Sequence, residues 1–500
     1  MAGRTYADAV TALNTLQSNF AVVDKFRKSG MGSNKDSIPE MVEWCRSIGY
    51  EPSDFDRLNA IHIAGTKGKG STSAFISSIL GQYRSPSTSK SEHTLIHKIG
   101  LYTSPHLRFV RERIQIDNEP LSEEAFARYF YETWDRLEET ATAKGEPPDI
   151  TAKPAYFRFL TLMAYHTYMS EGVDTAIIEC GIGGEYDSTN ILVKPTVTGI
   201  TSLGIDHTAM LGNTIEEIAW HKGGIMKASA PCFTAPQPPA AIEVLRKRAD
   251  EIPTKLHVVD RDPSLQDVKL GLAADFQKTN ASLAVAIAET HLVAIGQQDP
   301  KPHDNLPPQF IRGLEQVRWP GRCETRREKN IAWHIDGGHT LESIEVAGSW
   351  LASQIPPSRS PKRTRILLFN QQTRDANALA RALHRTLASA LHDEQPFTHA
   401  VFCTNVTFEQ EGYRPDLVSM NTSSAAVERL EVQRGLAHTW SGVDPAAVVE
   451  VKRSIEEAIA WCRDVAGAGR GERDEEVMVL VTGSVHLVGG FLEVLETGKG

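Results

Sequence analysis

The sequence has few cysteines, and no two of them stand at a spacing that would bind a metal ion. Six cysteines in 500 residues are too sparse for a disulfide scaffold, so we expect free thiols in a reducing compartment. No apolar run is long enough to span a bilayer. The first residues, MAGRTYADAV, lack the features of a signal or transit peptide. We therefore expect a cytoplasmic protein. A mitochondrial form would need a leader added by translation from a start site further upstream.

An excess of positive charge is also lacking. The formal net charge of −10 disfavours a nucleic-acid partner held by phosphate contacts, although local basic patches can still bind anionic ligands. Hydrophobic residues make up 41% and charged residues 23% of the chain, as in ordinary globular proteins. A chain of this length can form two or more domains, each with its own core.

The most informative stretch is residues 59–71, with the sequence NAIHIAGTKGKGS. It predicts the end of a buried strand, then a tight glycine-rich turn, then a helix that starts near Ser71. This arrangement presents backbone N–H groups and a helix N-terminus to a phosphate, and Lys69 adds a positive charge. The common P-loop has Ser or Thr directly after its lysine, whereas Gly70 intervenes here. The alternative interpretation is a lysine-bearing surface turn.

Two further predicted strands end in polar loops. Residues 173–180 form an apolar run with Glu179 near its end, and residues 195–207 end in Asp206 and His207. In a parallel α/β sheet, ligands bind at the carboxyl ends of the strands, so we expect these residues at one edge of one sheet with the glycine-rich turn. Glu179 is then either a Mg²⁺ ligand beside phosphates or a cap for nearby N–H groups. His207 alone would be a structural histidine.

Two other polar segments are ambiguous when taken singly. Ser104 lies in a Ser-Pro-His loop after an expected strand, and most such loops are only turns. Residues 214–217, TIEE, form a capping-box signature for a helix that carries Lys222. A lysine near the end of a helix is ordinarily a favourable partner for the helix dipole.

The C-terminal part of the chain predicts a second domain. A proline-rich stretch, residues 297–309, is expected to be the linker. Strands are expected at 331–336, 365–370, 399–405 and 476–483. Helices are expected at 342–354, 375–391 and 446–464. The predicted fold class is therefore α/β: residues 1–296 form a P-loop-type, mostly parallel sheet flanked by helices, and residues 310–500 form a smaller α/β domain.

Taken in order, these motifs resemble a known pattern. GTKGKGS, YTSPHL, ECGIGGEYDSTN, GIDH, HKGGI, RWPGR, DGGHT and TGSVHLVGG are similar to the motifs of the Mur ligase superfamily, and LNTLQSN with RERIQID resembles its folate branch. The chain thus resembles eukaryotic folylpolyglutamate synthases of the fungal type over nearly its whole length, apart from an insertion at residues 84–98. That resemblance implies an ATP-dependent ligase that adds L-glutamate to the γ-carboxylate of a reduced folate through an acyl phosphate.

The resemblance also implies roles for individual residues. ATP would be bound by Thr66, Lys67, Gly68, Lys69, Gly70, Ser71, Asn280, Arg322 and Asp336. Two magnesium ions would be bound by Ser104, Glu179, His207 and a carbamylated Lys222. Catalysis would involve Lys69, Lys222 and His339, and Ser484 would approach the incoming glutamate. The reduced folate, L-glutamate and ATP would meet between two closing domains of a monomer, and the family pattern leaves room for a monovalent cation.

Other functions remain open. A dihydrofolate synthase, which adds the first glutamate to dihydropteroate, would carry nearly the same motifs. A nucleotide-dependent switch would use the P-loop without ligation, but the joint presence of Ser104, Glu179, His207 and Lys222 argues against it. A Mur-type cell-wall ligase is disfavoured because no N-terminal domain suited to a UDP-sugar is evident.

Overall fold

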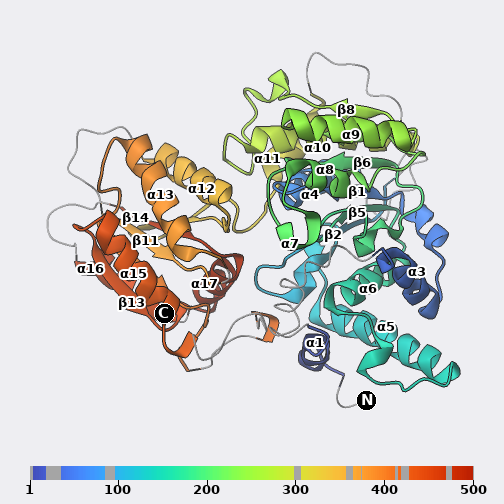
Figure 1. Ribbon diagram of the computed structural model, residues 1–500, viewed down its shortest axis with the longest axis horizontal. Helices are drawn as coiled ribbons and strands as arrows, with labels where there is room; N and C mark the ends of the chain where they lie inside the picture. The colour runs from blue at the N-terminus through green and yellow to red at the C-terminus, as the bar shows by residue number, and fades with distance from the viewer. Residues whose placement is uncertain are drawn as a thin grey trace. The chain divides into compact units, whose positions relative to one another are not determined.

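The computed structural model describes residues 4–17, 35–84, 96–297, 306–355, 364–372, 374–410, 415–417, 427–468 and 476–498. These residues form two compact units, coloured mainly blue to green and orange to red in Figure 1. The first unit comprises Met1–His106, Val110–Gly271 and Phe276–Arg318, and the second comprises Leu107–Phe109, Leu272–Asp275 and Trp319–Gly500. Most of the predicted linker and of the predicted insertion lies outside the described residues.

The first unit contains an eight-stranded sheet in the order β4-β3-β2-β5-β1-β6-β7-β8. Its strands are β1 (Ile61–Ala64), β2 (Ile99–Tyr102), β3 (Ile114–Ile116), β4 (Glu119–Pro120), β5 (Thr175–Glu179), β6 (Val197–Ile200), β7 (Cys232–Thr234) and β8 (Leu256–Val258). The six strands β2, β5, β1, β6, β7 and β8 are neighbours in that order and pair in parallel. At one edge, β3 pairs antiparallel with β2, and β4 pairs antiparallel with β3. Because β1 lies between β5 and β6, and β2 lies beside β5, the carboxyl ends of these four strands meet at one edge of the sheet.

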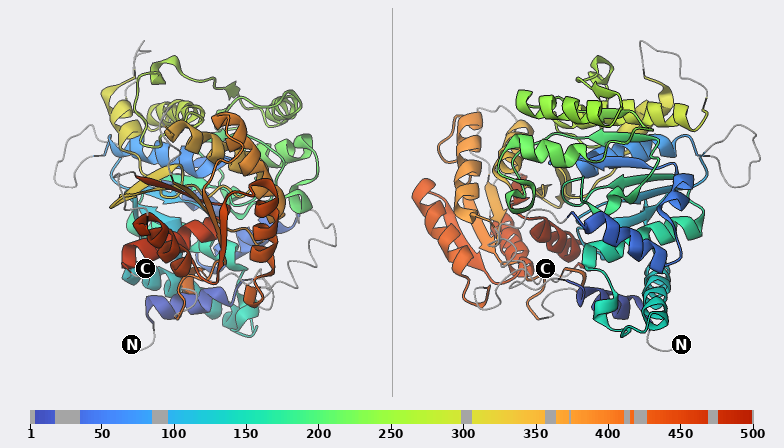
Figure 2. Two further views of the ribbon diagram at one scale, coloured as in Figure 1. Left: turned by 90° about the vertical axis from the view of Figure 1, so that its left-hand side faces the viewer. Right: turned by 45° about the vertical axis from the view of Figure 1, so that its right-hand side comes forward.

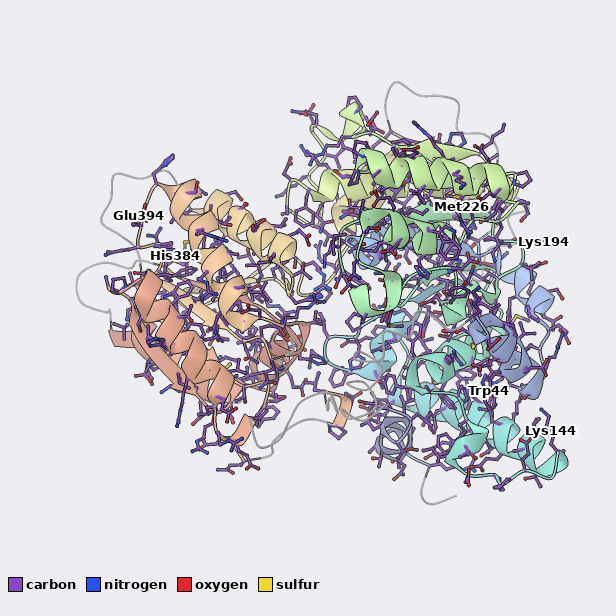
Figure 3. All side chains as sticks on the ribbon, in the orientation of Figure 1. Trp44, Lys144, Lys194, Met226, His384 and Glu394 are labelled. Atoms are coloured by element: carbon purple, nitrogen blue, oxygen red, sulfur yellow. The ribbon has the colours of Figure 1, made fainter. Side chains whose placement is uncertain are left out.

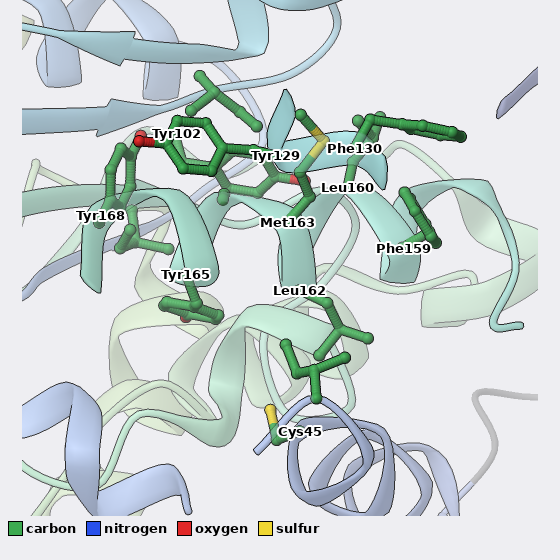
Figure 4. Packing of buried hydrophobic residues seen from close by; sticks show 14 of the residues in the cluster. Cys45, Tyr102, Tyr129, Phe130, Phe159, Leu160, Leu162, Met163, Tyr165 and Tyr168 are labelled. Carbon is green, nitrogen blue, oxygen red and sulfur yellow. The ribbon is translucent and has the colours of Figure 1, made fainter. Parts of the chain in front are cut away.

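Helices cover both faces of this sheet (Figure 2). They are α1 (Tyr6–Asn14), α3 (Ser37–Ser47), α4 (Lys69–Gly81), α5 (Glu123–Ala143), α6 (Tyr156–Glu171), α7 (Thr208–Leu211), α8 (Ile215–Gly223), α9 (Pro239–Glu251), α10 (Gln277–Ala294) and α11 (Pro308–Gln316). On one face α4 packs against α10 and α11. On the other, one hydrophobic core contains Tyr102 of β2, Phe130 of α5, and Phe159 and Tyr168 of α6, and Figure 4 shows Tyr102 beside Tyr168. A smaller core lies beside α8 and α9 and includes the buried Met226 (Figure 3).

The second unit contains a six-stranded sheet in the order β13-β12-β11-β14-β10-β9. Its strands are β9 (Glu324–Glu328), β10 (Ile331–Ile335), β11 (Arg365–Phe369), β12 (His399–Cys403), β13 (Val448–Lys452) and β14 (Val477–Thr482). Only β9 is antiparallel to its neighbour among these strands. The helices are α12 (Leu341–Gln354), α13 (Ala376–Leu391), α15 (Glu431–Val443), α16 (Ile455–Ala468) and α17 (Val485–Thr497). Two mostly parallel sheets flanked by helices confirm the predicted fold class.

One predicted element of the second unit is wrong. The helix expected at 446–464 begins only at Ile455, and Val448–Lys452 forms β13, paired in parallel with β12. The sequence VVEVK is rich in β-branched residues, which favour strands. The backbone N–H of Glu457 donates to the Ser454 hydroxyl at 3.2 Å, so this serine caps the helix where it starts.

Two absences expected from composition can be compared with the structure. All six cysteines lie within the described residues, are buried and are free thiols. None of the helices in the described part of the chain is long and apolar enough to cross a membrane.

Candidate active site

The P-loop connects β1 to α4 at the carboxyl edge of the first sheet. Gly65 has φ +148° and Gly68 has φ +89°, and a Cβ at Gly68 would lie 2.3 Å from Asn280 Oδ1, so only glycine fits there. The carbonyl of Ser202, after β6, accepts hydrogen bonds from the N–H groups of Thr66 and Lys67, each at 3.0 Å. These hydrogen bonds join the loop to the segment that follows β6, and α4 begins next with Gly68 as its N-cap, an arrangement that suits an anion.

Two lysine side chains converge on the carbonyl of Gly65. Lys222 Nζ of α8 donates to this oxygen at 2.8 Å, and Lys69 Nζ of the P-loop donates to it at 3.2 Å. Lys69 Nζ also lies 3.9 Å from Glu179 Oε1. The structure therefore brings together three residues that lie far apart in the sequence and that the sequence assigned to one site.

Burial changes the acid–base behaviour of Lys222. Its side chain is buried, and this burial, assisted by the charge of Lys69, lowers the pKa of Lys222 from 10.5 to about 7. A lysine in water is almost fully protonated at neutral pH, whereas this amine is neutral in a large fraction of molecules. The site thus supplies a lysine that can act as a nucleophile.

Glu179 at the end of β5 is a buried carboxylate beside the Ser104 loop. Its Oε2 accepts the backbone N–H of Ser104 at 3.2 Å, which joins the ends of β5 and β2. Among the described residues, no three His, Cys, Asp or Glu side chains come together as metal ligands. A magnesium site here would need oxygen donors of other kinds, and the Ser104 hydroxyl and a carbamate on Lys222 are of the type that this ion prefers. Of the residues present at this edge of the sheet, the Glu179 carboxylate and the Ser104 hydroxyl are oxygen donors of the kind that would fit magnesium.

Asp206 and His207 lie after β6, next to the P-loop. Asp206 Oδ2 accepts from Lys67 Nζ at 3.1 Å, and Asp206 Oδ1 accepts from the backbone N–H of His207 at 2.9 Å. His207 has φ +52° and is the N-cap of α7. The sequence placed His207 at this edge of the sheet, but the pairing of Asp206 with Lys67 was not predicted.

Helix α10 adds a residue that sequence reasoning missed. Gln277 is fully buried, and its Nε2 donates to the Ser71 hydroxyl at 3.3 Å while its Oε1 accepts from Asn280 Nδ2 at 2.8 Å. Asn280 was predicted, and it does lie against the P-loop at Gly68. The available signal for Gln277 was its position three residues before Asn280, which puts both on one face of the helix.

Arg322, Asp336 and His339 belong to the second unit and lie together there. Asp336 follows β10, is buried, and accepts the backbone N–H groups of Cys323 at 3.0 Å and Gly338 at 2.9 Å. Burial raises the pKa of Asp336, and the nearby Arg322 charge opposes that rise. His339 Nδ1 lies 3.1 Å from the Gly337 carbonyl oxygen. The predicted second-domain residues thus share the carboxyl end of β10.

Ser484 was predicted to approach glutamate, and it follows β14 in the second unit. Its hydroxyl accepts the backbone N–H of His486 at 3.2 Å, so that it is the N-cap of α17. This contact is a sufficient structural reason for a serine at the position. Its role toward a substrate stays a prediction.

A cavity of about 660 Å³ lies along α8 and α9 and is a different feature. Tyr186, Trp220, His221, Lys247 and Arg248 are among its lining residues. Neither the P-loop nor Glu179 or Lys222 lines it. Because the phosphate-binding geometry lies elsewhere, we place the active site at the carboxyl edge of the sheet rather than in this cavity.

Comparison with known proteins identifies similar chains. No family model matches the sequence. A folylpolyglutamate synthase from Neurospora crassa is 48% identical over 494 residues, which cover 99% of this chain and 92% of that protein. A folylpolyglutamate synthase from Saccharomyces cerevisiae is 48% identical over 504 residues, covering 99% and 88% of the two chains.

Solved structures share the fold at much lower identity. The apo form of L. casei FPGS matches with a TM-score of 0.69 and 21% identity, covering 98% of this chain and 100% of that one. E. coli FolC in complex with DHPP and ADP matches with a TM-score of 0.66 and 21% identity, covering 99% of each chain. These structures support the fold alone. The relatives at 48% identity extend over almost the whole of this chain, and the chain therefore belongs to the folylpolyglutamate synthase family.

Proposed function

We propose that this chain is an ATP-dependent ligase that joins L-glutamate to the γ-carboxylate of a reduced folate, releasing ADP and phosphate. The observation that carries the proposal is the convergence of Lys69, Lys222 and Glu179 at the P-loop in a member of this family. A carboxylate cannot form an amide directly because oxide is a poor leaving group. Transfer of the γ-phosphoryl group of ATP to the carboxylate gives an acyl phosphate, whose leaving group is phosphate.

Positive charge is needed for this first step because both reactants are anions. The first turn of α4 and the Lys69 ammonium would bind the β- and γ-phosphates. Lys69 is close enough to Glu179 for an ion pair, so the carboxylate also orients the lysine. Gln277 would hold the Ser71 hydroxyl, and Asn280 would lie on the adenine side of the nucleotide.

Magnesium would be held by Ser104, Glu179, His207 and a carbamylated Lys222, with two ions in the site. When bound, magnesium supplies positive charge that stabilises the transferring phosphoryl group. The carbamate forms when the neutral Lys222 amine attacks CO₂, making an N–C bond and releasing a proton. The lowered pKa of Lys222 leaves enough neutral amine for this reaction at neutral pH.

The second step joins glutamate to the activated folate. The neutral amine of L-glutamate attacks the acyl carbon, and the tetrahedral oxyanion collapses to the amide as phosphate leaves. Hydrogen-bond donors close to that oxyanion lower the barrier. We propose that Arg322 and Asp336 contact ATP, that His339 lies near the reacting groups, and that Ser484 approaches glutamate. Family resemblance supports these four roles.

A product assay tests the proposal. The purified chain is incubated with ATP, Mg²⁺ and labelled L-glutamate, with tetrahydrofolate in one reaction and dihydropteroate in another. We expect label in γ-linked folates from tetrahydrofolate. Label only in the product of dihydropteroate would identify a dihydrofolate synthase instead, and ATP hydrolysis that ignores both pterins would favour a nucleotide-dependent switch.

Paired lysine variants connect the assay to the site. Lys69→Met removes the charge at the P-loop, whereas Lys194→Met removes the charge of a largely exposed lysine (Figure 3). We expect the first variant to lose ligation and the second to retain it. Equal activity of the two variants would contradict the role of Lys69.

A further inference from the structure

A buried carboxylate with no role in the proposed reaction joins the P-loop to His207. Asp206 is only 7% exposed, and both of its oxygens are used. One oxygen accepts from Lys67 Nζ at 3.1 Å, and the other accepts from the backbone N–H of His207 at 2.9 Å. A single side chain therefore connects the loop after β1 to the loop after β6.

The backbone of His207 needs support. Its φ of +52° is in the left-handed region, which residues with a side chain rarely adopt unless their surroundings impose it. The His207 carbonyl accepts the N–H groups of Met210 at 2.9 Å and Leu211 at 3.0 Å. Helix α7 has only four residues, so it is a weak anchor. The Asp206 carboxylate adds a contact to the peptide that precedes the His207 Cα, through the N–H of His207.

Asp206 is itself held in place by the P-loop. The N–H groups of Thr66 and Lys67 bind the Ser202 carbonyl, and the Thr66 hydroxyl donates to the Gly204 carbonyl at 3.1 Å. Lys67 thus extends toward Asp206 from a backbone that the same loop fixes.

We propose that Asp206 is a positioning residue, which fixes the backbone of His207 so that the imidazole is oriented toward the metal ion of the ligase. The inference rests on the proposed function, in which His207 is a magnesium ligand. Residues that hold a metal ligand in place commonly change metal affinity 10- to 100-fold when altered. The rival explanation is that Asp206 only neutralises Lys67.

Two substitutions of Asp206 separate geometry from charge. Asp206→Asn removes the charge but keeps an oxygen that can accept the N–H of His207. Asp206→Glu keeps the charge near Lys67 but lengthens the side chain, so that its oxygens no longer fit the N–H of the next residue. If Asp206 positions His207, Asp206→Glu should weaken metal binding more than Asp206→Asn does. If Asp206 only neutralises Lys67, Asp206→Asn should weaken metal binding more.

The probe is Mn²⁺, whose binding to the full chain is measured by electron paramagnetic resonance, and Mg²⁺ half-saturation is measured in the ligase assay. We expect Asp206→Glu to weaken Mn²⁺ binding at least tenfold and Asp206→Asn less than threefold. Asp149→Glu is the matched control, because Asp149 also accepts a backbone N–H, from Thr151 at 2.8 Å, in the segment between α5 and α6. It should change neither quantity more than twofold.

His207→Ala provides the reference for the metal site. If this variant loses Mn²⁺ affinity while Asp206→Glu does not, the positioning role of Asp206 is overturned and the proposed function stands. An Asn variant as impaired as the Glu variant, or more so, would also overturn it in favour of charge. If His207→Ala leaves Mn²⁺ binding unchanged, the metal role of His207 fails, and the inference fails with it.

Discussion

Replacing Lys222 with methionine is expected to stabilise the chain at neutral pH and to abolish ligation. Burial, with the charge of Lys69, lowers the pKa of Lys222 from 10.5 to about 7. In the unfolded chain the lysine keeps its ordinary pKa, so at neutral pH the unfolded state binds a proton more tightly than the folded state does. This difference favours unfolding. Methionine is of similar length and has no charge to desolvate.

The size of the effect follows from the pKa. The lowered value corresponds to about 5 kcal/mol of destabilisation below pH 7, where the lysine is protonated in both states. The penalty decreases as pH rises from 7 and vanishes above 10.5, because neither state then binds the proton. It should be about 4 kcal/mol at pH 7 and about 2 kcal/mol at pH 9. Lys222→Met also loses the hydrogen bond to Gly65, which offsets about 1 kcal/mol. The variant should therefore be more stable than the parent by about 3 kcal/mol at pH 7 and by about 1 kcal/mol at pH 9.

Equilibrium urea unfolding of the parent and of Lys222→Met, at both pH values and in CO₂-free buffer, measures this difference. The two proteins share every other titrating group, so the change in the difference with pH reports Lys222. A difference that is equal at the two pH values would refute the reasoning, as would a variant less stable than the parent at both. In the ligase assay, Lys222→Ala should regain part of the lost activity when a short carboxylic acid is added, and full activity without that acid would contradict the carbamate.

Three further variants test other parts of the structure. Lys69→Met should lower kcat at least about 100-fold with little change in melting temperature, as measured by the product assay and a thermal scan. Burial lowers the pKa of His291 to about 3, so below pH 6.5 only the unfolded state protonates it, which should cost about 1.4 kcal/mol of stability per pH unit. In urea unfolding between pH 6 and 4, the stability of His291→Gln should therefore decrease less steeply than that of the parent. Gly489→Ala would place a Cβ 1.8 Å from the Leu107 carbonyl oxygen and should destabilise the second unit by about 2 kcal/mol or more, whereas Gly442→Ala, whose Cβ would meet nothing within 4 Å, should not.

The sequence predicted correctly which polar residues lie together where strands end, and their roles stay predictions. The glycine-rich turn, Glu179 and His207 each follow an apolar run, and parallel strands bring their carboxyl ends to one edge. The order β2-β5-β1-β6 puts these turns side by side. The capping box at residues 214–217 was also confirmed, because the Thr214 hydroxyl and the Glu217 carboxylate exchange hydrogen bonds with backbone N–H groups, a local pattern that needs no tertiary information.

Contacts between distant segments could not be predicted in this way. Lys67 and Asp206 are 139 residues apart, and their pairing depends on β1 and β6 being neighbours. In the sequence, nothing distinguishes Gln277 from an ordinary helical residue. Its contact with Ser71 depends on the packing of α10 against α4. The strand Val448–Lys452 is missed because its five residues are too few to show a clear period beside the longer helical pattern that follows, and its pairing with β12 decides the outcome.

Under the proposed role of Lys222, stability and activity are opposed at this site. A carbamate forms only from an unprotonated amine, and a lysine exposed to water at neutral pH almost never presents one. Burial beside Lys69 removes that obstacle but destabilises the folded state, and the same low polarity strengthens the attraction of the P-loop charges for a triphosphate. The substitutions around Gly65 that stabilise the chain most should therefore be those that remove its activity, whereas stabilising substitutions on exposed helix faces should leave ligation unchanged.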